Sequence, residues 1–419
     1  MKILFVSNLY PPEILGGYEI LCAHVVAQLV SRGHQALVLT AKGGIADETP
    51  AAGAASGPTK SALPVAAGQS DGLDGVGSAG ELVRRSLQLY LPFGQPAQLA
   101  RRARQRVEGP NRRAMARALE DFKPDLVFVW SQLRLGLGAA REAEGRGYPV
   151  VHTMNDEHIL IFRPGERKGL DGLVRGLLEE LVFPASTWKG WKGKRILVIS
   201  ETVRSRLAAM APRFAQARVI FQGIPLEQFP LKGNPGEGSD PLEVLYAGQL
   251  HRYKGVHTVI EAVALAGKDH FSVTIAGAGD PVYEEDLRNL AQEKGLHVRF
   301  AGRLDAGSMG ELYRRCHVLA FTSVWDEPFG LTHLEAMASG TPVVSVSHGG
   351  PGEFLVHGEN ALLFTKERPD ELAVHLGSLL KDGSLRRRLA LAGRKTVEEQ
   401  FSLEKYTDRL ETQLREALA

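Results

Sequence analysis

Short apolar runs alternate with longer stretches of helical spacing along most of the chain. The runs are rich in Val, Ile, Leu and Phe, which is typical of buried strands. Strands are predicted at residues 2–8, 35–40, 125–131, 149–155, 195–200, 218–222, 242–248, 271–277, 298–303, 318–323 and 341–346. Because helical stretches separate them, we predict an α/β fold of doubly wound, Rossmann-like parallel sheets.

The helical stretches and the one long irregular stretch are predicted in the same way. Helices are expected at residues 18–31, 81–91, 96–107, 110–121, 256–266 and 331–339, and residues 371–407 are expected to be largely helical, with a last helix to about residue 418. Residues 41–80 are dense in Gly, Ala, Ser and Pro. We expect them to form a long mobile loop, interrupted at most by a short strand near 63–65.

Length and composition indicate two domains. At 419 residues the chain is longer than one hydrophobic core usually serves, and 44% hydrophobic with 23% charged residues is ordinary for a globular protein. Residues 230–241 are rich in Pro and Gly, which is typical of a linker. We therefore expect an N-terminal domain at 1–229 and a C-terminal domain at 230–402.

The net charge, +2 at pH 7, is unevenly spread. Residues 1–230 hold 29 Lys and Arg against 21 Asp and Glu, about +8, which leaves about −6 for the rest. Nine Arg and one acid lie between residues 82 and 117, and a second basic stretch includes Trp188 and Trp191. The basic half would suit an anionic membrane surface or an anionic lipid-linked acceptor, or it is a solvated face beside a structural loop. Without a nucleic-acid module, nucleic-acid binding is not expected.

Targeting signals are not evident in the chain. Residues 1–8 hold only a short apolar run, too short for the core of a signal peptide, and no window approaches the roughly 18 apolar residues of a membrane span. We expect a cytoplasmic protein, either free or peripheral to the inner face of the membrane. Cys22 and Cys316 lie far apart in the sequence and suggest buried thiols more than a disulfide.

The most informative stretch runs from residue 318 to residue 352. It predicts a strand, a loop, a helix and a second strand, an order that places the loop at the carboxyl edge of a parallel sheet. Unpaired N–H groups at the helix start can hold a phosphate there, and Gly330 permits close approach. Glu327 precedes the helix and Glu335 lies inside it, and carboxylates accept hydrogen bonds from sugar and ribose hydroxyls. Taken alone, the two acids would equally suit a solvated surface.

The residues around these acids carry a longer pattern. The stretch from Glu327 spells Glu-Pro-Phe-Gly-Leu, the stretch from Glu335 spells Glu-Ala-Met-Ala, and Gly-Thr-Pro-Val-Val and a Gly pair follow. This closely resembles the signature of retaining glycosyltransferases of family four, which have the GT-B fold of two Rossmann-like domains facing a cleft. The resemblance implies that Glu327 contacts donor sugar hydroxyls and Glu335 binds the nucleotide ribose. It also implies that amides of Phe329, Gly330 and Leu331 contact the phosphates or the sugar.

A cationic loop follows the strand at 242–248. Cations at the carboxyl end of a strand are well placed for a diphosphate leaving group. Family members commonly have an Arg and a Lys here, and this chain keeps Lys254 but has Gln249 at the Arg position. Our hypothesis is that Arg252 supplies the missing charge, and the alternative is a pair of solvated loop cations.

Two further positions are expected beside the nucleotide. The glycines around Gly277 would let a base or ribose approach the backbone, although an ordinary turn between strand and helix would also use them. The resemblance places the segment of Arg303 at the border of the base, where Arg303 would either stack or face water.

The first half offers its own groups at the carboxyl ends of strands. Gly16 and Gly17 follow the first strand, as in family four, where such a loop lies against the diphosphate and acceptor, so we expect both at the cleft. In the family the strand at 149–155 often ends in a His near the reacting sugar, but here that position is Asn155. Asn155 and Asp156 are the cleft candidates, whereas His152 is expected beneath the sheet.

Together these features predict a retaining hexosyltransferase-type enzyme that moves a sugar from a nucleotide diphosphate sugar to a hydroxyl of a glycan or lipid-linked acceptor. No cofactor or metal ion is expected, because no His and Asp cluster of the metal-binding type stands out. The family is thought to use no covalent nucleophile, so we assign none, and its last helix, here about 403–419, usually crosses back onto the first domain. A nucleotide-sugar epimerase of the same fold and a non-catalytic sugar-nucleotide binder remain as alternatives. The sugar, the base, the acceptor and the oligomeric state stay open.

Overall fold

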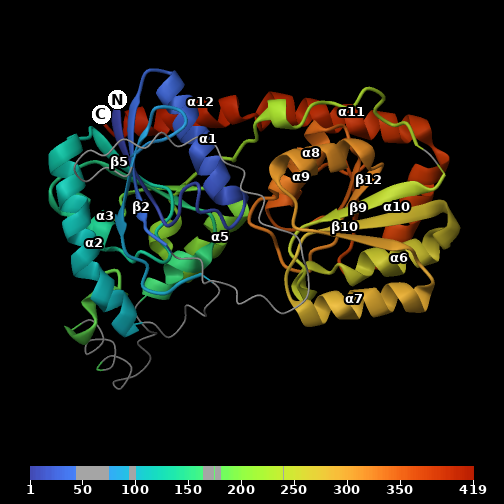
Figure 1. The fold of residues 1–419 in the computed structure, drawn as a ribbon, viewed down its shortest axis with the longest axis horizontal. Coiled ribbons are helices and arrows are strands. Elements are labelled where there is room, and N and C mark those ends of the chain that lie inside the picture. The colour runs from blue at the N-terminus through green and yellow to red at the C-terminus, as the bar shows by residue number, and fades with distance from the viewer. Residues whose placement is uncertain (44–74, 94–100, 164–173, 175–180, 239) are drawn as a thin grey trace. The chain divides into compact units, whose positions relative to one another are not determined.

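The computed structural model describes residues 1–43, 75–93, 101–163, 174, 181–238 and 240–419 (Figure 1). The chain divides into two compact units. The first unit comprises Met1–Ile199, Val203–Ile220 and Thr407–Ala419, and the second comprises Ser200–Thr202 and Phe221–Tyr406. The short strand expected near 63–65 lies outside the described residues.

The first unit is built on a sheet of eight described strands. They are β1 (Lys2–Ser7), β2 (Gln35–Ala41), β3 (Gly75–Val76), β4 (Leu82–Leu87), β5 (Leu126–Val129), β6 (Val150–Met154), β7 (Arg195–Val198) and β8 (Arg218–Val219). The order is β3-β4-β2-β1-β5-β6-β7-β8, and all pairs are parallel except β3 with β4. The strand order reverses between β1 and β5, which makes this the switch point of a doubly wound sheet.

Helices connect the strands of this unit. They are α1 (Gly17–Ser31), α2 (Arg101–Phe122), α3 (Gly138–Gly145), α5 (Glu201–Met210), which begins in the second unit, and the short 3-10 turns η2 (Glu157–Phe162), η3 (Pro184–Ser186) and η4 (Pro212–Phe214). The strands read as near-continuous apolar runs because helices cover a parallel sheet on both faces. Five residues of β1 are buried, from Ile3 to Ser7.

Two helix predictions in this unit are wrong. Residues 82–87, predicted as part of a helix, form strand β4, which pairs with β2. Its two Arg have partners outside the strand, Arg84 with Asp121 at 2.9 Å between Nη1 and Oδ2, and Arg85 with the Tyr10 carbonyl at 3.1 Å. The helices predicted at 96–107 and 110–121 are, over the described residues, the single helix α2, and Pro110 lies inside it. For residues 82–87, pairing with β2 overrides local propensity.

The second unit is built on six parallel strands. They are β9 (Leu242–Ala247), β10 (Phe271–Ala276), β11 (Val298–Gly302), β12 (Val318–Phe321), β13 (Val343–Val346) and β14 (Leu362–Phe364), in the order β11-β10-β9-β12-β13-β14. This is the strand order of a Rossmann fold, with its switch point between β9 and β12. The expected fold class of two Rossmann-like, doubly wound parallel-sheet domains is therefore confirmed.

Helices cover both faces of the second sheet. They are α6 (His257–Gly267), α7 (Pro281–Lys294), α8 (Ala306–Arg315), α9 (Leu331–Ala338), α10 (Pro369–Lys381) and α11 (Gly383–Gln400), with the 3-10 turns η5 (Leu226–Gln228), η6 (Arg252–Lys254), η7 (Lys268–His270) and η8 (Gly350–Glu353). Helices α6, α7 and α10 lie together, and α8, α9 and α11 form a second group (Figure 1). The apolar sides of α6, α7 and α10 form one continuous core with the sheet.

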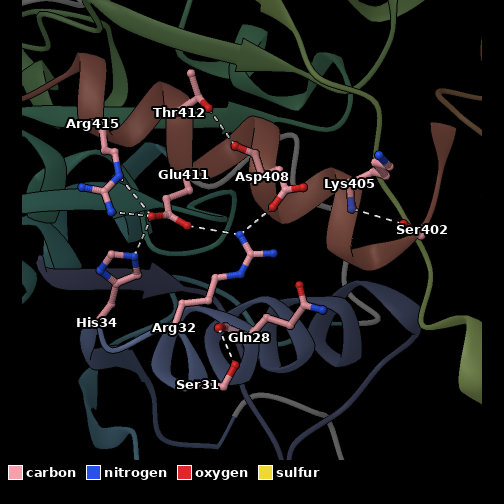
Figure 2. Close-up of polar contacts among 10 residues, drawn as sticks. All are labelled: Gln28, Ser31, Arg32, His34, Ser402, Lys405, Asp408, Glu411, Thr412 and Arg415. Carbon is pink, nitrogen blue, oxygen red and sulfur yellow. Dashed lines mark hydrogen bonds and ion pairs between the residues drawn. The ribbon is translucent and has the colours of Figure 1, made fainter. Parts of the chain in front are cut away.

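The last helix, α12 (Leu403–Glu416), is tied to the first unit by charged groups (Figure 2). Glu411 Oε1 lies 3.0 Å from His34 Nε2 and 2.6 Å from Arg415 Nη2, and Glu411 Oε2 lies 3.1 Å from Arg32 Nη1. Arg32 also pairs with Asp408 at 2.8 Å. We call Arg32, His34, Asp408, Glu411 and Arg415 the Glu411 cluster. It joins α12 to the end of α1 and the start of β2.

The tryptophans of the second basic stretch are structural. Trp191 is buried and donates its indole N–H to His152 Nε2 at 3.3 Å, and His152 is fully buried beneath the sheet, as predicted. The Arg213 guanidinium lies over both Trp188 and Trp191, at 5.3 and 4.5 Å from the ring centroids. Trp191 is buried and Trp188 is half-buried, so neither ring of this stretch stands fully exposed beside its charges.

Both cysteines are free and buried, as predicted, Cys22 in α1 and Cys316 just after α8. Among the described residues, we find no helix with the length and apolar character that crossing a bilayer requires.

Candidate functional site

Two loops meet at the switch point of the second sheet. One follows β9 and contains the turn η6, and the other follows β12 and leads into α9. Lys254 from the first loop and Glu327 from the second form an ion pair, 2.6 Å between Nζ and Oε1, and each side chain is 13% exposed. Neighbouring strands thus place a cation and an acid at the edge where open α/β folds bind ligands.

Backbone contacts hold the two loops together. The amides of Val324 and Trp325 donate to the Tyr253 carbonyl at 2.9 and 3.1 Å. The Thr322 hydroxyl donates to the Lys254 carbonyl at 3.1 Å. The Lys254–Glu327 pair is therefore positioned by the main chain on both sides rather than by the two flexible side chains alone.

The start of α9 is open for a ligand. Helix α9 begins after Gly330, and no side chain caps this terminus, which lies wholly within the described residues. An uncapped helix start presents free N–H groups and the positive end of the helix dipole. Phe329 itself is buried and stacks on Phe221, with 5.8 Å between ring centroids, so its side chain anchors the loop. Only its main chain remains to contact a ligand.

The Gly349–Gly350 pair packs against the same loop. The Gly350 amide donates to the Glu327 carbonyl at 2.7 Å. A Cβ at Gly350 would lie 2.3 Å from the Pro328 carbonyl oxygen, which no side chain can tolerate. These glycines therefore fix the loop that carries Glu327. Glu353 accepts hydrogen bonds from the amides of Glu201 and Thr202 at 2.8 and 2.7 Å.

Glu335 has a different environment from Glu327. It lies on α9, and its Oε2 accepts from the Tyr313 hydroxyl at 2.9 Å. Burial raises the pKa of the Glu335 carboxyl to about 7, although the hydrogen bond from Tyr313 offsets part of that rise. Sequence reasoning missed Tyr313, because a Tyr in a preceding helix carries no signal of a partner 22 residues further on.

Arg252 turns away from Lys254. Its guanidinium pairs with Asp286 of α7 and lies 5.4 Å from the Tyr283 ring centroid, and the side chain is 72% exposed. Gln249, at the position where an Arg was expected, is exposed, and its Oε1 lies 3.4 Å from the Tyr253 hydroxyl. The loop after β9 therefore places Lys254 against Glu327 but directs Arg252 to another partner.

Gly277 and Arg303 follow β10 and β11. A Cβ at Gly277 would lie 1.8 Å from the Gly248 carbonyl oxygen, so the backbone of the loop after β9 already requires a glycine here. The Gly277 amide donates to the Gly302 carbonyl at 2.8 Å. Arg303 is exposed just beyond β11. The roles of Gly277 and Arg303 in binding a nucleotide stay predictions.

In the first unit, Tyr18 links the predicted turn at Gly16 and Gly17 to the predicted Asn155. Tyr18, directly after Gly17, accepts a hydrogen bond from the Asn155 amide and donates to the Trp130 carbonyl. A Cβ at Gly16 or Gly17 would meet no described atom within 4 Å. Asp156 instead accepts from the His158 amide at 2.9 Å and caps η2. Sequence reasoning missed Tyr18, which links the glycine turn to the end of β6.

Among the described residues, His, Cys, Asp and Glu side chains do not gather in groups of three or more that could hold a metal ion.

Comparisons with known families cover both halves of the chain. The family model described as Glycosyltransferase Family 4 matches residues 15–228, just over half of the chain. The model described as Glycosyl transferases group 1 matches residues 228–396.

Curated relatives are similar over the whole chain or over a part of it. A glycogen synthase of Mycobacterium tuberculosis is 26% identical over 410 residues, which cover 96% of this chain and 91% of that protein. The lipopolysaccharide core biosynthesis glycosyltransferase LpsE of Rhizobium meliloti is 37% identical over 173 residues, which cover 41% of this chain and 48% of that protein.

Solved structures share the fold. HepE of Anabaena, crystallised with UDP and glucose, has a TM-score of 0.68 and 20% identity, and the match covers 99% of this chain and 100% of HepE. Sucrose-phosphate synthase of Thermosynechococcus elongatus has a TM-score of 0.72 and 20% identity, and the match covers 99% of this chain and 98% of that one. With both halves matched by family models, and with the two Rossmann-like sheets and the Glu327 loop in place, the chain belongs to the group 1, family 4 glycosyltransferases.

Proposed function

We propose that this glycosyltransferase moves a hexose from a nucleotide diphosphate sugar to a hydroxyl of a glycan or lipid-linked acceptor, with retention of the anomeric configuration. The observation that carries the donor assignment is the Lys254–Glu327 pair at the switch point, directly ahead of the uncapped start of α9. HepE, which has the same fold, was crystallised with UDP and glucose and supports a donor of this class.

Each group has a task that its chemistry suits. The free amides at the start of α9 would bind the diphosphate, and the Lys254 ammonium would neutralise charge on it as it leaves. Glu327 would accept hydrogen bonds from the sugar hydroxyls and orient the ring, and the carboxyl of Glu335 would accept from the ribose. No covalent nucleophile is assigned. The bond between the anomeric carbon and the diphosphate breaks, the acceptor oxygen bonds to that carbon, and its proton passes to the departing diphosphate.

The remaining predicted site residues keep proposed roles of lesser weight. Gly277, Gln249 and Arg303 would border the nucleotide, and Arg252 would add charge only after leaving Asp286. In the first unit, Gly16 and Gly17 would lie against the diphosphate and the acceptor, and Asn155 and Asp156 would lie near the reacting sugar. Tyr18 would fix the turn beside Asn155. A contact with anionic membrane would rest on the basic charge of the first unit, since Trp191 is buried and Trp188 is half-buried. No metal or cofactor is included.

The experiment is a donor panel. Purified protein is incubated with nucleotide sugars that differ in base and sugar, with and without glycan and lipid-linked acceptors, and release of nucleotide diphosphate is measured. We expect release from one donor class, stimulated by an acceptor. NMR of the product then reports the anomeric configuration, and inversion would refute the proposed retention.

The same panel separates the alternatives. An epimerase would release an altered free sugar without any acceptor. A non-catalytic binder would bind a nucleotide sugar in a titration but release no nucleotide diphosphate with any acceptor. Either result would refute transfer as the function.

A further inference from the structure

Two exposed aromatic rings stand beside the Lys254–Glu327 pair. Among the large hydrophobic side chains that are exposed in the described residues, the aromatic ones are Tyr253 and Trp325, 45% and 40% exposed. Trp130 and Trp191, by contrast, are buried. The rings of Tyr253 and Trp325 contact each other edge to face, with 6.1 Å between centroids. We call Tyr253 and Trp325 the aromatic pair. Large aromatic side chains normally bury most of their surface, so two exposed rings in contact call for an explanation.

The aromatic pair is held rigidly. Tyr253 and Trp325 belong to the two loops that the main chain ties together, since the Trp325 amide donates to the Tyr253 carbonyl at 3.1 Å. The Ser323 hydroxyl donates to the Trp325 carbonyl at 2.8 Å. His251 stacks on Tyr253 with 5.2 Å between centroids and 15° between planes. A surface that is ordered in this way can bind a ligand without a large entropic cost.

The aromatic pair lies at the switch point of the second sheet, next to Lys254. Tyr253 follows β9 and Trp325 follows β12, so both rings stand at the switch point of the sheet. The Lys254 ammonium lies 5.5 Å from the Tyr253 centroid and 5.1 Å from the Trp325 centroid. The ammonium that pairs with Glu327 therefore also lies against both rings.

We propose that the aromatic pair is a binding platform for a sugar ring, a role that rests on the proposed transferase function. One face of a pyranose carries C–H groups with slight positive charge, which are attracted to the negative face of an aromatic ring. The hydroxyls at the ring edge need polar partners. Tyr253 and Trp325 supply the aromatic faces, and Lys254 and Glu327 supply the polar partners.

Other occupants fit the surface less well. Two rings are far too small for a stable protein interface, which needs roughly 800 Å² on each partner. A nucleobase would also stack on aromatic rings, and it is tested as a separate outcome below. The sugar ring belongs either to the donor or to the acceptor, and the two arms of the experiment distinguish these sources.

The test compares Trp325→Ala and Tyr253→Ala with Trp325→Phe and Tyr253→Phe, which keep a ring. Titration calorimetry measures the affinity for the preferred nucleotide sugar and for its free nucleotide diphosphate, and kinetics measure the KM for the acceptor. We expect either the nucleotide-sugar affinity or the acceptor KM to worsen about fivefold to tenfold in the Ala variants, with the nucleotide diphosphate affinity within about twofold of wild type. The Phe variants should keep most of the affinity.

The control is Leu265→Ala, which truncates an exposed apolar side chain on α6. It should behave as wild type in both arms. Unchanged donor affinity and acceptor KM in the Ala variants would overturn the inference, and so would an equal loss with the free nucleotide diphosphate, which would assign the rings to the base. A wild-type protein that releases no nucleotide from any donor would refute the proposed function itself, and the platform with it.

Discussion

Glu411 and Glu327 are both paired with cations, but their surroundings differ. Glu411 meets Arg32, His34 and Arg415, and both of its oxygens are occupied (Figure 2). Burial alone would raise the pKa of its carboxyl, but hydrogen bonds from these three groups outweigh that effect and lower the pKa to about 2. Among the described residues, Glu327 pairs with one cation, Lys254, and lies beside two exposed rings and a helix start that no side chain caps.

The difference distinguishes a structural acid from one that can exchange partners. Glu411 already has as many charged partners as a carboxylate can readily take, so its energy goes into joining α12 to the first unit. Glu327 and Lys254 can each take a new partner. Ligand hydroxyls can bind Glu327 in place of Lys254, and phosphate oxygens can bind Lys254 in place of Glu327. Counting partners therefore separates the two kinds of site better than counting charges does.

The largest effect is expected at Lys254. Lys254→Ala removes the cation that pairs with Glu327, so kcat/KM for transfer should fall about a hundredfold or more, as when a preorganised charge partner is lost. Steady-state kinetics measure the change, and thermal unfolding should show a folded protein. Lys381→Ala, an exposed Lys at the end of α10, is the matched control and should leave the rate unchanged. A Lys254→Ala enzyme as fast as wild type would remove the assignment.

The second effect concerns stability and belongs to the Glu411 cluster. The pKa of Glu411 is lowered in the folded protein, so its contribution is present above the ordinary pKa of a Glu and is lost as the pH falls toward 2. Glu411→Ala should lower the free energy of unfolding by about 2 kcal/mol at pH 7, and by much less at pH 3. Denaturant unfolding at both pH values measures this.

The matched control for that stability effect is Glu399→Ala. Glu399 lies 3.8 Å from Lys395 on the surface of α11 and should contribute little at either pH. A loss at pH 3 equal to the loss at pH 7 would show that Glu411 acts through packing alone. Nucleotide binding should be unchanged in both variants.

A smaller effect of opposite sign is expected at Glu335. Because its pKa is raised to about 7, the carboxyl is most favourable when protonated, and stability is lost as the pH rises from the ordinary pKa of a Glu through 7. Glu335→Gln should therefore raise the free energy of unfolding at pH 8 by about 1 kcal/mol, less than the full shift would give because the residue is only partly buried.

The same substitution should weaken nucleotide binding. The ribose hydroxyls bind best to the ionised carboxyl, so wild-type affinity should rise between pH 6 and pH 8, and Glu335→Gln should be about fivefold weaker at pH 8 and flat across this range. Titration with the nucleotide diphosphate measures both. A variant that is less stable and binds as wild type would contradict the ribose assignment.

The smallest effect is expected at Arg252. Its ion pair with Asp286 is largely exposed, so Arg252→Ala should change the free energy of unfolding by less than about 0.5 kcal/mol. If Arg252 stays with Asp286 during turnover, kcat/KM should fall no more than about threefold. A loss that approaches that of Lys254→Ala would instead support Arg252 as the cation that replaces the Arg expected at Gln249, and Asp286→Asn should then raise the rate.

Several elements could be predicted because their information is local. The strands of the second unit, the helix after Gly330 and the Glu327 loop follow from short apolar runs, a helix breaker and a long motif. The wrong prediction of a helix over residues 82–87 has a cause that is not local. Strand β4 was predicted as a helix because its stability comes from pairing with β2 and from distant partners of Arg84 and Arg85.

The family, the two-sheet architecture and the position of the Glu327–Glu335 motif can be predicted from the chain alone, since periodicity and motif spacing are properties of neighbouring residues. The three-dimensional packing was needed to show that Lys254 meets Glu327, that Arg252 turns to Asp286, and that Tyr313 shares a hydrogen bond with Glu335. It also decided that Trp191 is buried while Trp325 is exposed. These outcomes depend on which strands become neighbours in the sheet, and residues far apart in the chain carry no local record of that pairing.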